Sequence, residues 1–513
     1  MEFNRYIWDL YKNSKEGQTY IEYYRDLNDT KIQELKQKYE FVTKVGFYKD
    51  AKSKEIVHTK NLIEIVKNFK INNQIKNINQ AVNYFFELIN DGIPIKNPFS
   101  ENAKLFGENG QHLQYDLIFV APVSIGLYLK SPDYFFPLFE TYDFIKIINL
   151  IKGFNLNLPE IPGKLDFLNR IKYYGKLCKL FYNFRTNNNL SPEELCAFLY
   201  DFGPNVVEKK FDENLPEPSK VWFIGGGIND NGDIEFLNEE ITGQTIAGWQ
   251  GNIDTRRGDI IVMYCLKPMS AIHSIWRAYS EGYNNPFFGF YNMIKIFKPI
   301  RVKQISYQEL AHNKVFAKNA LIRRRMQGIN GVPIKIHEYN ELLTILQSKG
   351  QDISALPRLS RIENISTEHL KNEKDVESNL IEPFLKRLEY ERVDWQRQIP
   401  VKMGSGYSYF PDYAIGANMT KGNEKAKYII EAKYSIHNTK KLYKDYYQAK
   451  SYAVQLNTLG FALAAKEGIW LYFHDGNNDY DFERNLFHNW KELENPDIFH
   501  NVLLKIGRNK ILK

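Results

Sequence analysis

The spacing of apolar residues divides the chain into a helical first part and a more strand-rich remainder. Up to about residue 212, apolar side chains recur at every third or fourth position, as in 77–89 and 144–153, which predicts amphipathic helices. Ser191-Pro192-Glu193-Glu194 places Ser at an N-cap, Pro at N1 and Glu at N3, so a further helix is expected to begin there. Gly203-Pro204 predicts the end of that helix.

Short apolar runs replace this spacing after a proline-containing break at 212–219. Lys220–Ile224, Ile260–Tyr264 and Ala271–Ala278 are typical of strands, with a tight turn at Arg257-Gly258-Asp259 and a closing helix near 339–347. We therefore expect a multidomain α+β protein. Its parts are a helical domain, a β-rich domain, a linker and an α/β domain, over residues 1–212, 213–347, 348–372 and 373–513.

Composition supports a globular protein rather than a disordered or fibrous one. The 513 residues are 43% apolar, 15% aromatic and 25% charged, and no strict repeat runs through them. No run of about 18 uncharged apolar residues occurs, and Met1–Arg5 does not begin a signal peptide, so we expect a cytoplasmic protein with no membrane partner. The three cysteines are far apart and support neither a disulfide framework nor a zinc site. A net charge of +7 permits a polyanionic partner.

The last domain opens with a predicted amphipathic helix that carries an acid on its apolar face. The helix is expected over 373–390 and kinked at Pro383, with Glu377 in the middle of the apolar stripe. A carboxylate that faces a core costs several kcal/mol unless it is compensated. A metal ion, a lysine or a hydrogen-bond network should therefore accompany Glu377.

Two predicted strands add further charged groups. Glu431 and Lys433 project from the same face of a strand over 427–434, and a hairpin from the strand over 410–415 would bring Asp412 beside them. Carboxylates are the hard ligands that bind a divalent ion for phosphodiester hydrolysis, and a lysine can orient the attacking water or stabilise negative charge. The sequence thus predicts a Mg²⁺ or Mn²⁺ site.

Pro411-Asp412 followed by Glu431-Ala432-Lys433 resembles the PD-(D/E)xK nuclease motif. With the helix around Glu377 and the segment 447–453, residues 373–475 look like the nuclease domain that opens type I restriction R subunits. The resemblance implies that Glu377, Asp412 and Glu431 are metal ligands or support them, with Asp412 and Glu431 as the direct ligands. It also implies that Lys433 is the catalytic lysine and that Gln448 lies on an active-site helix.

Two alternatives remain open within this motif. Glu373 lies one turn before Glu377 and could take its role, and Gln448-Ala449-Lys450 spells the Q-x-K variant of the motif. We favour Glu431 because an apolar strand precedes it, whereas 443–456 is predicted to be helical. No G-x-x-x-x-G-K-[ST] occurs, so the chain contains no ATP motor of the kind that follows this nuclease in R subunits.

The β-rich domain combines aromatic and basic residues that suit nucleic-acid binding. The Trp222 strand, Trp249 to Asn252, the 257–264 turn and strand, and the Trp276 strand are similar to the PUA-like superfamily, particularly EVE domains and their YTH relatives. That resemblance implies a modified base held by an aromatic pocket. Tryptophans in a small β-domain are also commonly core residues. The candidate base-binding residues are Trp222, Trp249, Asn252, Tyr264 and Trp276, and the candidate phosphate-binding residues are Arg323, Arg324 and Arg325.

Together these features predict a modification-dependent restriction endonuclease of the type IV kind, a homodimer that cuts phage DNA containing modified bases, with modified cytosine as the favoured target. Two alternatives are an RNA-directed defence or toxin nuclease and a non-catalytic nucleic-acid-binding module.

Overall fold

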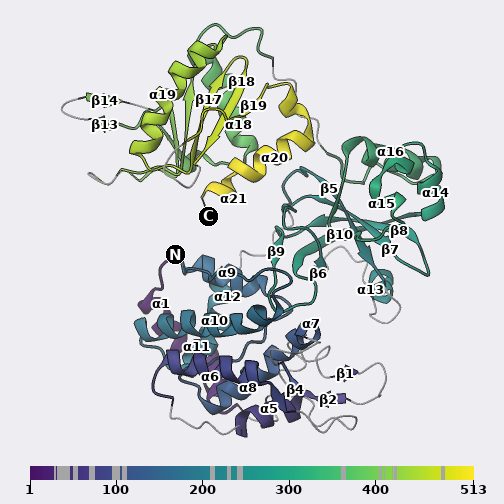
Figure 1. The fold of residues 1–513 in the computed structure, drawn as a ribbon, viewed down its shortest axis with the longest axis vertical. Coiled ribbons are helices and arrows are strands. Elements are labelled where there is room, and N and C mark those ends of the chain that lie inside the picture. Colours follow the sequence, from purple (N-terminus) through teal and green to yellow (C-terminus); the bar gives the residue numbers. More distant parts are fainter. Residues whose placement is uncertain are drawn as a thin grey trace. The chain divides into compact units, whose positions relative to one another are not determined.

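The computed structural model describes residues 1–27, 31, 47–49, 56–68, 75–94, 104–106, 113–207, 214–227, 233–239, 246–359, 366–403, 407–409, 411–418, 420, 424–474 and 480–512. The chain divides into two compact units (Figure 1). Unit 1 contains Met1–Leu215, Thr242–Thr255 and Ala278–Lys298, and unit 2 contains the rest. The fold is mixed α/β with helices and several sheets, as expected for a multidomain α+β protein. Two segments of the predicted β-rich domain group with the helices.

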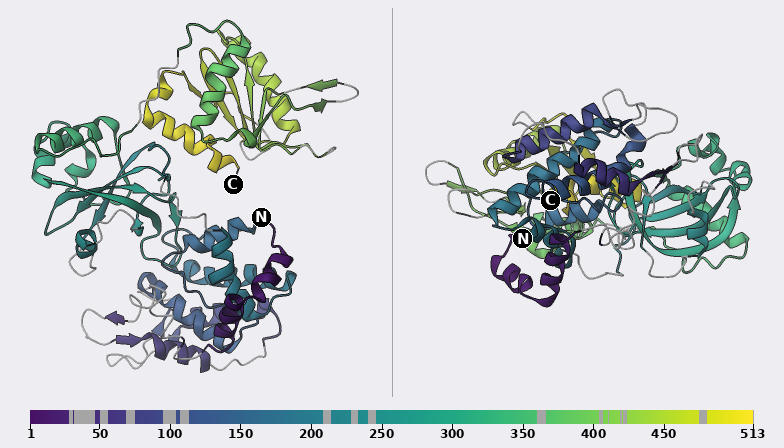
Figure 2. Two further views of the ribbon diagram at one scale, coloured as in Figure 1. Left: turned by 180° about the vertical axis from the view of Figure 1, so that it is seen from behind. Right: turned by 90° about the horizontal axis from the view of Figure 1, so that it is seen from below.

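Helices dominate unit 1 (Figures 1 and 2), and their apolar faces form one core around Trp8, Phe85 and Phe198. The helices predicted over 77–89 and 144–153 are confirmed as α6 and α9. Two short strand pairs accompany them, β1 (Phe47–Lys49) with β2 (Ile56–His58) and β3 (Ile93–Pro94) with β4 (Lys104–Leu105). The helices are α1 (Arg5–Lys12), α2 (Lys15–Arg25), α5 (Thr59–Asn68), α6 (Ile78–Asp91), α7 (Leu113–Asp116), α8 (Val120–Lys130), α9 (Ile145–Gly153), α10 (Phe167–Asn187), α11 (Pro192–Ala197) and α12 (Gly203–Val207).

The predicted helix start at Ser191 is confirmed, but its predicted end is wrong. Ser191 Oγ accepts the amide of Glu194, whose carboxylate accepts the amide of Ser191, so both halves of the capping box are present. The helix passes through Gly203-Pro204, because a π-helical turn over Phe198–Phe202 precedes them and α12 follows. The wider turn lets the Gly203 amide donate to Phe198, and Pro204, which has no N–H, falls in the first turn of α12.

A buried arginine helps to explain why 278–298 groups with the helices. Arg170 of α10 is fully buried and donates to the carbonyl oxygens of Lys164, Pro286 and Phe288, at 2.7, 3.0 and 2.5 Å. Burial lowers the pKa of Arg170 to about 10. The planar guanidinium binds several carbonyl oxygens at once, and its bonds to Pro286 and Phe288 fix the segment 278–298 on the helical core.

The middle of the chain forms a seven-stranded sheet in the order β11-β5-β7-β8-β10-β6, with β9 beside β10. The parallel pair β5–β7 is followed by the antiparallel pair β7–β8, and the three predicted strands and the closing helix are confirmed. The strands are β5 (Val221–Gly226), β6 (Ala247–Gln250), β7 (Ile260–Cys265), β8 (Ala271–Ala278), β9 (Tyr283–Asn284), β10 (Asn292–Ser306) and β11 (Val332–Ile334). The helices are α13 (Asp233–Glu239), α14 (Tyr307–His312), α15 (Ala320–Arg323) and α16 (Ile336–Ser348).

The last part of unit 2 is built on a six-stranded sheet in the order β12-β15-β16-β17-β18-β19, in which β16 and β17 are parallel. Successive residues of β16 enter opposite cores: Ile430 packs with the helices α18 and α20, and Ile429 packs with α19 (Figure 1). The strands are β12 (Trp395–Arg397), β15 (Tyr413–Ile415), β16 (Tyr428–Ala432), β17 (Gly460–Ala465), β18 (Gly468–Phe473) and β19 (Leu486–His488), with β13 (Val401–Met403) and β14 (Tyr407–Tyr409) as a separate pair. The helices are α17 (Glu373–Val376), α18 (Glu382–Arg387), α19 (Thr439–Gln455), α20 (Pro496–Ile506) and α21 (Arg508–Ile511).

The helix predicted over 373–390 ends earlier than expected. A π-helical turn over Glu377–Ile381 joins α17 to α18, and Pro383 lies in the first turn of α18, where its missing N–H is tolerated. The helix stops at Arg387, because Glu389 adopts a left-handed φ of 68°. Among the described residues, no helix is long and apolar enough to cross a membrane.

Candidate functional site

The antiparallel pairing of β15 with β16 brings Asp412 to Glu431. Tyr413 is opposite Ile430, so Asp412, directly before β15, lies beside the end of β16. One carboxylate oxygen of Asp412, Oδ2, accepts the backbone N–H of Ala432 at 2.8 Å. The pairing therefore fixes the position of Asp412 relative to the Glu431-Ala432-Lys433 segment.

Glu431 lies at the centre of the side-chain contacts. Its Oε1 accepts hydrogen bonds from Lys433 Nζ at 2.8 Å and from Gln448 Nε2 at 3.1 Å. Its Oε2 is buried and has no hydrogen-bond partner among the described residues. The structure thus brings together four predicted site residues, with one buried carboxylate oxygen available to a further ligand.

The electrostatics of this group follow from burial of several charges in one place. Burial, reinforced by the charge of Asp412, raises the pKa of Glu431 to about 7. Burial also raises the pKa of Asp412, although the Ala432 amide and the charge of Lys433 oppose it. For Lys433, burial acts against the charged form, but the adjacent Glu431 outweighs it, so the pKa is above its usual value. Lys433 therefore carries its positive charge at neutral pH.

A second set of carboxylates lies around Asp412. Oxygens of Glu373, Glu377 and Asp412 lie within 4.8 Å of one another. This group contains Glu373, the alternative to Glu377, and does not include Glu431. Hard carboxylate oxygens are suitable ligands for Mg²⁺ or Mn²⁺, so the donor set fits such an ion, as does the buried, unpartnered oxygen of Glu431.

Glu377 has the compensating partner that its apolar surroundings require, and the partner is an arginine. Glu377 is 7% exposed and forms an ion pair with Arg397 of β12, which also lies 3.4 Å from Glu382. Arg397 was not among the predicted site residues. Arg397 reaches Glu377 because β12 pairs with β15, and no local sequence pattern predicts that pairing.

Two residues of α19 also extend the site beyond the prediction. Tyr452 Oη accepts from Gln448 Nε2 at 3.1 Å. Asp445 is 5% exposed, and its Oδ2 has no hydrogen-bond partner among the described residues. Asp445, Gln448 and Tyr452 occur at i, i+3 and i+7, a spacing that places them on one helix face and could have identified them.

Three of the candidate base-binding residues are buried in unit 2. The indole N–H of Trp222 donates to Asp259 at 2.9 Å, and that of Trp276 donates to Ser274 at 2.8 Å. Trp222, Tyr264 and Trp276 are 3%, 3% and 0% exposed. Their packing and hydrogen bonds fit the core alternative, because a base cannot stack on a ring that is already covered.

The other candidates are found in different surroundings. Trp249 and Asn252 belong to unit 1, where Trp249 is buried and Asn252 accepts the amide of Asp254 at 2.9 Å. The three arginines at 323–325 are exposed at the end of α15. Binding of a base or a phosphate by these residues stays a prediction.

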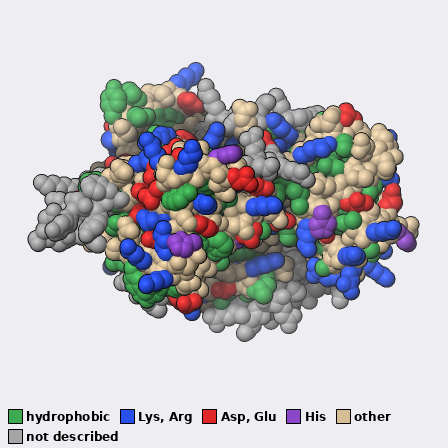
Figure 3. Space-filling model, turned by 90° about the horizontal axis from the view of Figure 1, so that it is seen from above, with side chains coloured by type: hydrophobic (Ala, Val, Ile, Leu, Met, Phe, Trp, Pro, Cys, Tyr) green, Lys and Arg blue, Asp and Glu red, His purple; other side chains and the backbone are tan. Residues whose placement is uncertain are grey.

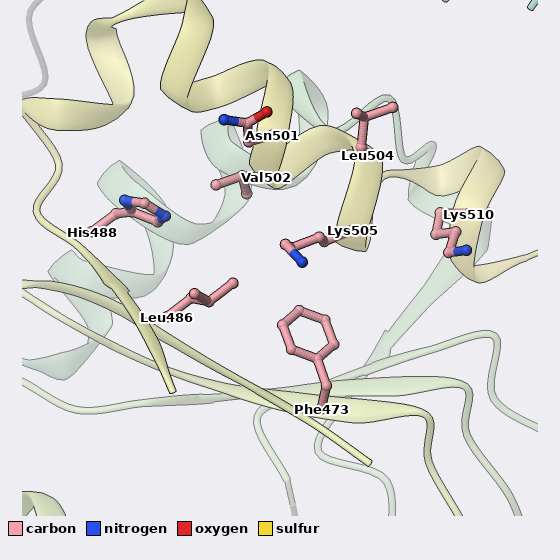
Figure 4. A pocket seen from close by; sticks show the side chains of 8 residues that line it. All are labelled: Phe473, Leu486, His488, Asn501, Val502, Leu504, Lys505 and Lys510. Carbon is pink, nitrogen blue, oxygen red and sulfur yellow. The ribbon is translucent and has the colours of Figure 1, made fainter. Parts of the chain in front are cut away.

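A cavity of about 620 Å³ lies between the strands β18 and β19 and the helices α20 and α21 (Figure 4). Lys505 Nζ lies over the ring of Phe473 there, 5.5 Å from its centroid. The lining contains none of the predicted site residues, so the cavity is separate from the carboxylate group. The lining residues are Phe473, Leu486, His488, Asn501, Val502, Leu504, Lys505 and Lys510.

Comparison with known proteins assigns no family. No family model matches the chain, and no curated protein matches it either. The chain is weakly similar to the NMR structure of Rpa0253 from Rhodopseudomonas palustris, at 16% identity and a TM-score of 0.21, over 25% of this chain and 94% of that one. A hypothetical protein from Leishmania major gives 15% identity and a TM-score of 0.21, over 26% and 97%. Likeness at this level carries no functional argument.

Proposed function

We propose that the protein is a Mg²⁺- or Mn²⁺-dependent endonuclease, with its active centre at the end of β16. The observation that carries the proposal is the convergence of Asp412, Glu431 and Lys433 beside the carboxylates of Glu373 and Glu377. Burial of the Glu431 carboxylate beside Asp412 is unfavourable for folding alone, as the raised pKa of Glu431 indicates, and such groups concentrate where chemistry needs them.

Each residue has a role that its contacts support. Asp412, with Glu373, Glu377 and the free oxygen of Glu431, would hold the divalent ion, which supplies a Lewis acid for the phosphoryl group and acidifies a bound water. Lys433, protonated and held by Glu431, stabilises negative charge on the phosphate. Gln448 donates to Glu431 and fixes its orientation.

The proposed substrate is DNA that contains modified bases, with modified cytosine as the favoured target, and the proposed role is defence against phage. The exposed arginines at 323–325 support contact with a polyanion. The surface drawn in Figure 3 mixes basic and acidic side chains without one large basic area. On this face, charge alone does not select the substrate, so selection would depend on recognition of the bases.

The test is cleavage of phage genomic DNAs with different cytosine modifications, and of unmodified plasmid, in the presence of Mg²⁺. We expect wild type to cleave a modified DNA and Lys433→Ala to be slower by about 100-fold or more, because it lacks the group that stabilises developing charge. Lys425→Ala, an exposed lysine before the same strand, is the matched control and should cleave normally. Equal cleavage by Lys433→Ala, or no cleavage of any DNA, would contradict the proposal.

A further inference from the structure

An exposed pair of tyrosines lies on α19, the helix that supplies Gln448 to the candidate active centre. Tyr443 and Tyr447 are 48% and 50% exposed, so a large part of each side chain is open to solvent. They are one helical turn apart, with ring centroids separated by 4.7 Å, and their hydroxyl groups are hydrogen-bonded at 2.8 Å. The rings meet edge to face, at an interplanar angle of 72°, and together they form one contiguous aromatic patch.

Neighbouring rings hold this pair in place. Tyr443 makes an edge contact with Phe482 at 5.1 Å, and Tyr447 makes one with the buried Tyr446 at 5.2 Å. Side chains that are already fixed lose little conformational entropy when a ligand binds to them. The exposed rings are thus suited to act as a preformed stacking surface.

Lysines lie between the tyrosine pair and the active centre. At about 100° per residue, Lys444 and Gln448 follow Tyr443 and Tyr447 round the helix, and Gln448 reaches Glu431. Lys440 and Lys444 are exposed, and neither forms an ion pair with a described residue. This side of α19 therefore presents lysine side chains beside the tyrosine rings, and it leads through Gln448 to the carboxylate group.

Lys441 extends the positive charge to the carboxylates themselves. At about 100° per residue, Lys441 lies on the same side of α19 as Gln448, which donates to Glu431. The first turn of α19 contains no acidic residue, and lysines there are unfavourable beside the helix dipole. These lysines do not stabilise the helix itself. They would, however, attract a bound polyanion.

We infer that this surface of α19, formed by Tyr443, Tyr447, Lys440 and Lys444, binds single-stranded DNA next to the scissile phosphate. Phosphates fit the lysines, and unpaired bases fit the tyrosine rings, because stacking on an exposed ring needs a base face that duplex pairing and stacking otherwise cover. The inference rests on the proposed nuclease function and adds a property to it: the strand to be cut is unpaired, or is opened, at the site.

The test measures binding without cleavage. Fluorescence anisotropy with the full-length protein in EDTA compares a labelled 20-nucleotide oligo-dT with a duplex of equal length. Tyr443→Ala/Tyr447→Ala should weaken binding of the single strand about tenfold or more and change duplex binding much less. Tyr443→Phe/Tyr447→Phe keeps the rings and should keep the affinity, and Lys440→Gln/Lys444→Gln should reduce the salt dependence of binding.

The matched control is Val454→Ala, because Val454 is 55% exposed on the same helix. Circular dichroism checks that each variant is folded. The inference is overturned if the double alanine variant binds oligo-dT as the Val454→Ala control does, if the loss is as large for duplex, or if an oligo-rU of the same length binds more tightly than oligo-dT. Lys433→Ala should still bind oligo-dT. Loss of oligo-dT binding in the tyrosine variant, combined with no cleavage of any DNA, would support single-strand binding by this surface but refute the nuclease and the position next to a scissile phosphate.

Discussion

His273 shows how a single buried side chain is held neutral by its neighbours. The indole of Trp276 donates to Ser274 Oγ, which lies 3.0 Å from His273 Nδ1, and His273 Nε2 lies 3.3 Å from Asn238 Oδ1. Arg301 also donates to Asn238. A neutral imidazole that accepts at Nδ1 and donates at Nε2 satisfies every one of these contacts.

Protonation of His273 should therefore destabilise the fold. Burial first, and the charge of Arg301 second, lower its pKa from 6.5 to about 4. The unfolded chain binds the proton more readily, so the contribution of His273 is complete above pH 6.5 and is lost as pH falls towards 4, by roughly 3 kcal/mol in total. Urea unfolding between pH 7 and 4 should show a steeper loss of stability for wild type than for His273→Gln. The exposed His437→Gln variant is the control and should follow wild type. If the stability of His273→Gln fell with pH as steeply as that of wild type, this account would be contradicted.

At the scale of elements, the capping box of α11 predicts a measurable local effect. Ser191→Ala removes the hydroxyl that accepts the Glu194 amide and leaves that donor without its cap. We expect the free energy of unfolding to fall by about 1 kcal/mol and the melting temperature by a few degrees. Differential scanning calorimetry measures both. Ser348→Ala is the control, because its hydroxyl donates to a carbonyl at a helix end; an equal effect in the two variants would argue against the cap.

The elements that could be predicted from sequence are those whose signal is local. Apolar spacing located α6, α9 and α19, and the strand before Glu431 distinguished that residue from Gln448. The passage of a helix through Gly203-Pro204 could not be predicted, because it depends on a π-helical turn that lets the Gly203 amide reach Phe198. The partner of Glu377 could not be predicted either, since Arg397 arrives only through the pairing of β12 with β15.

At the scale of the whole molecule, the proposed nuclease uses a single carboxylate–lysine group in each chain, the group around Asp412, Glu431 and Lys433. Cutting both strands of a duplex requires two such centres or two successive events at one centre. The two strands are antiparallel, so two centres related by a twofold axis match their symmetry. We therefore propose that two copies of the chain act together on DNA.

Mixing wild type with Lys433→Ala tests this proposal. If two copies act as a pair, excess Lys433→Ala would form mixed pairs that cut one strand, so nicked plasmid should accumulate while linear product falls. A modified supercoiled plasmid resolved on agarose shows both products in one lane. An equal mass of an unrelated protein controls for crowding and for non-specific competition. If linear product forms at an unchanged rate in the mixture, one copy cuts both strands in turn. In that case α19 of a single chain binds each strand separately.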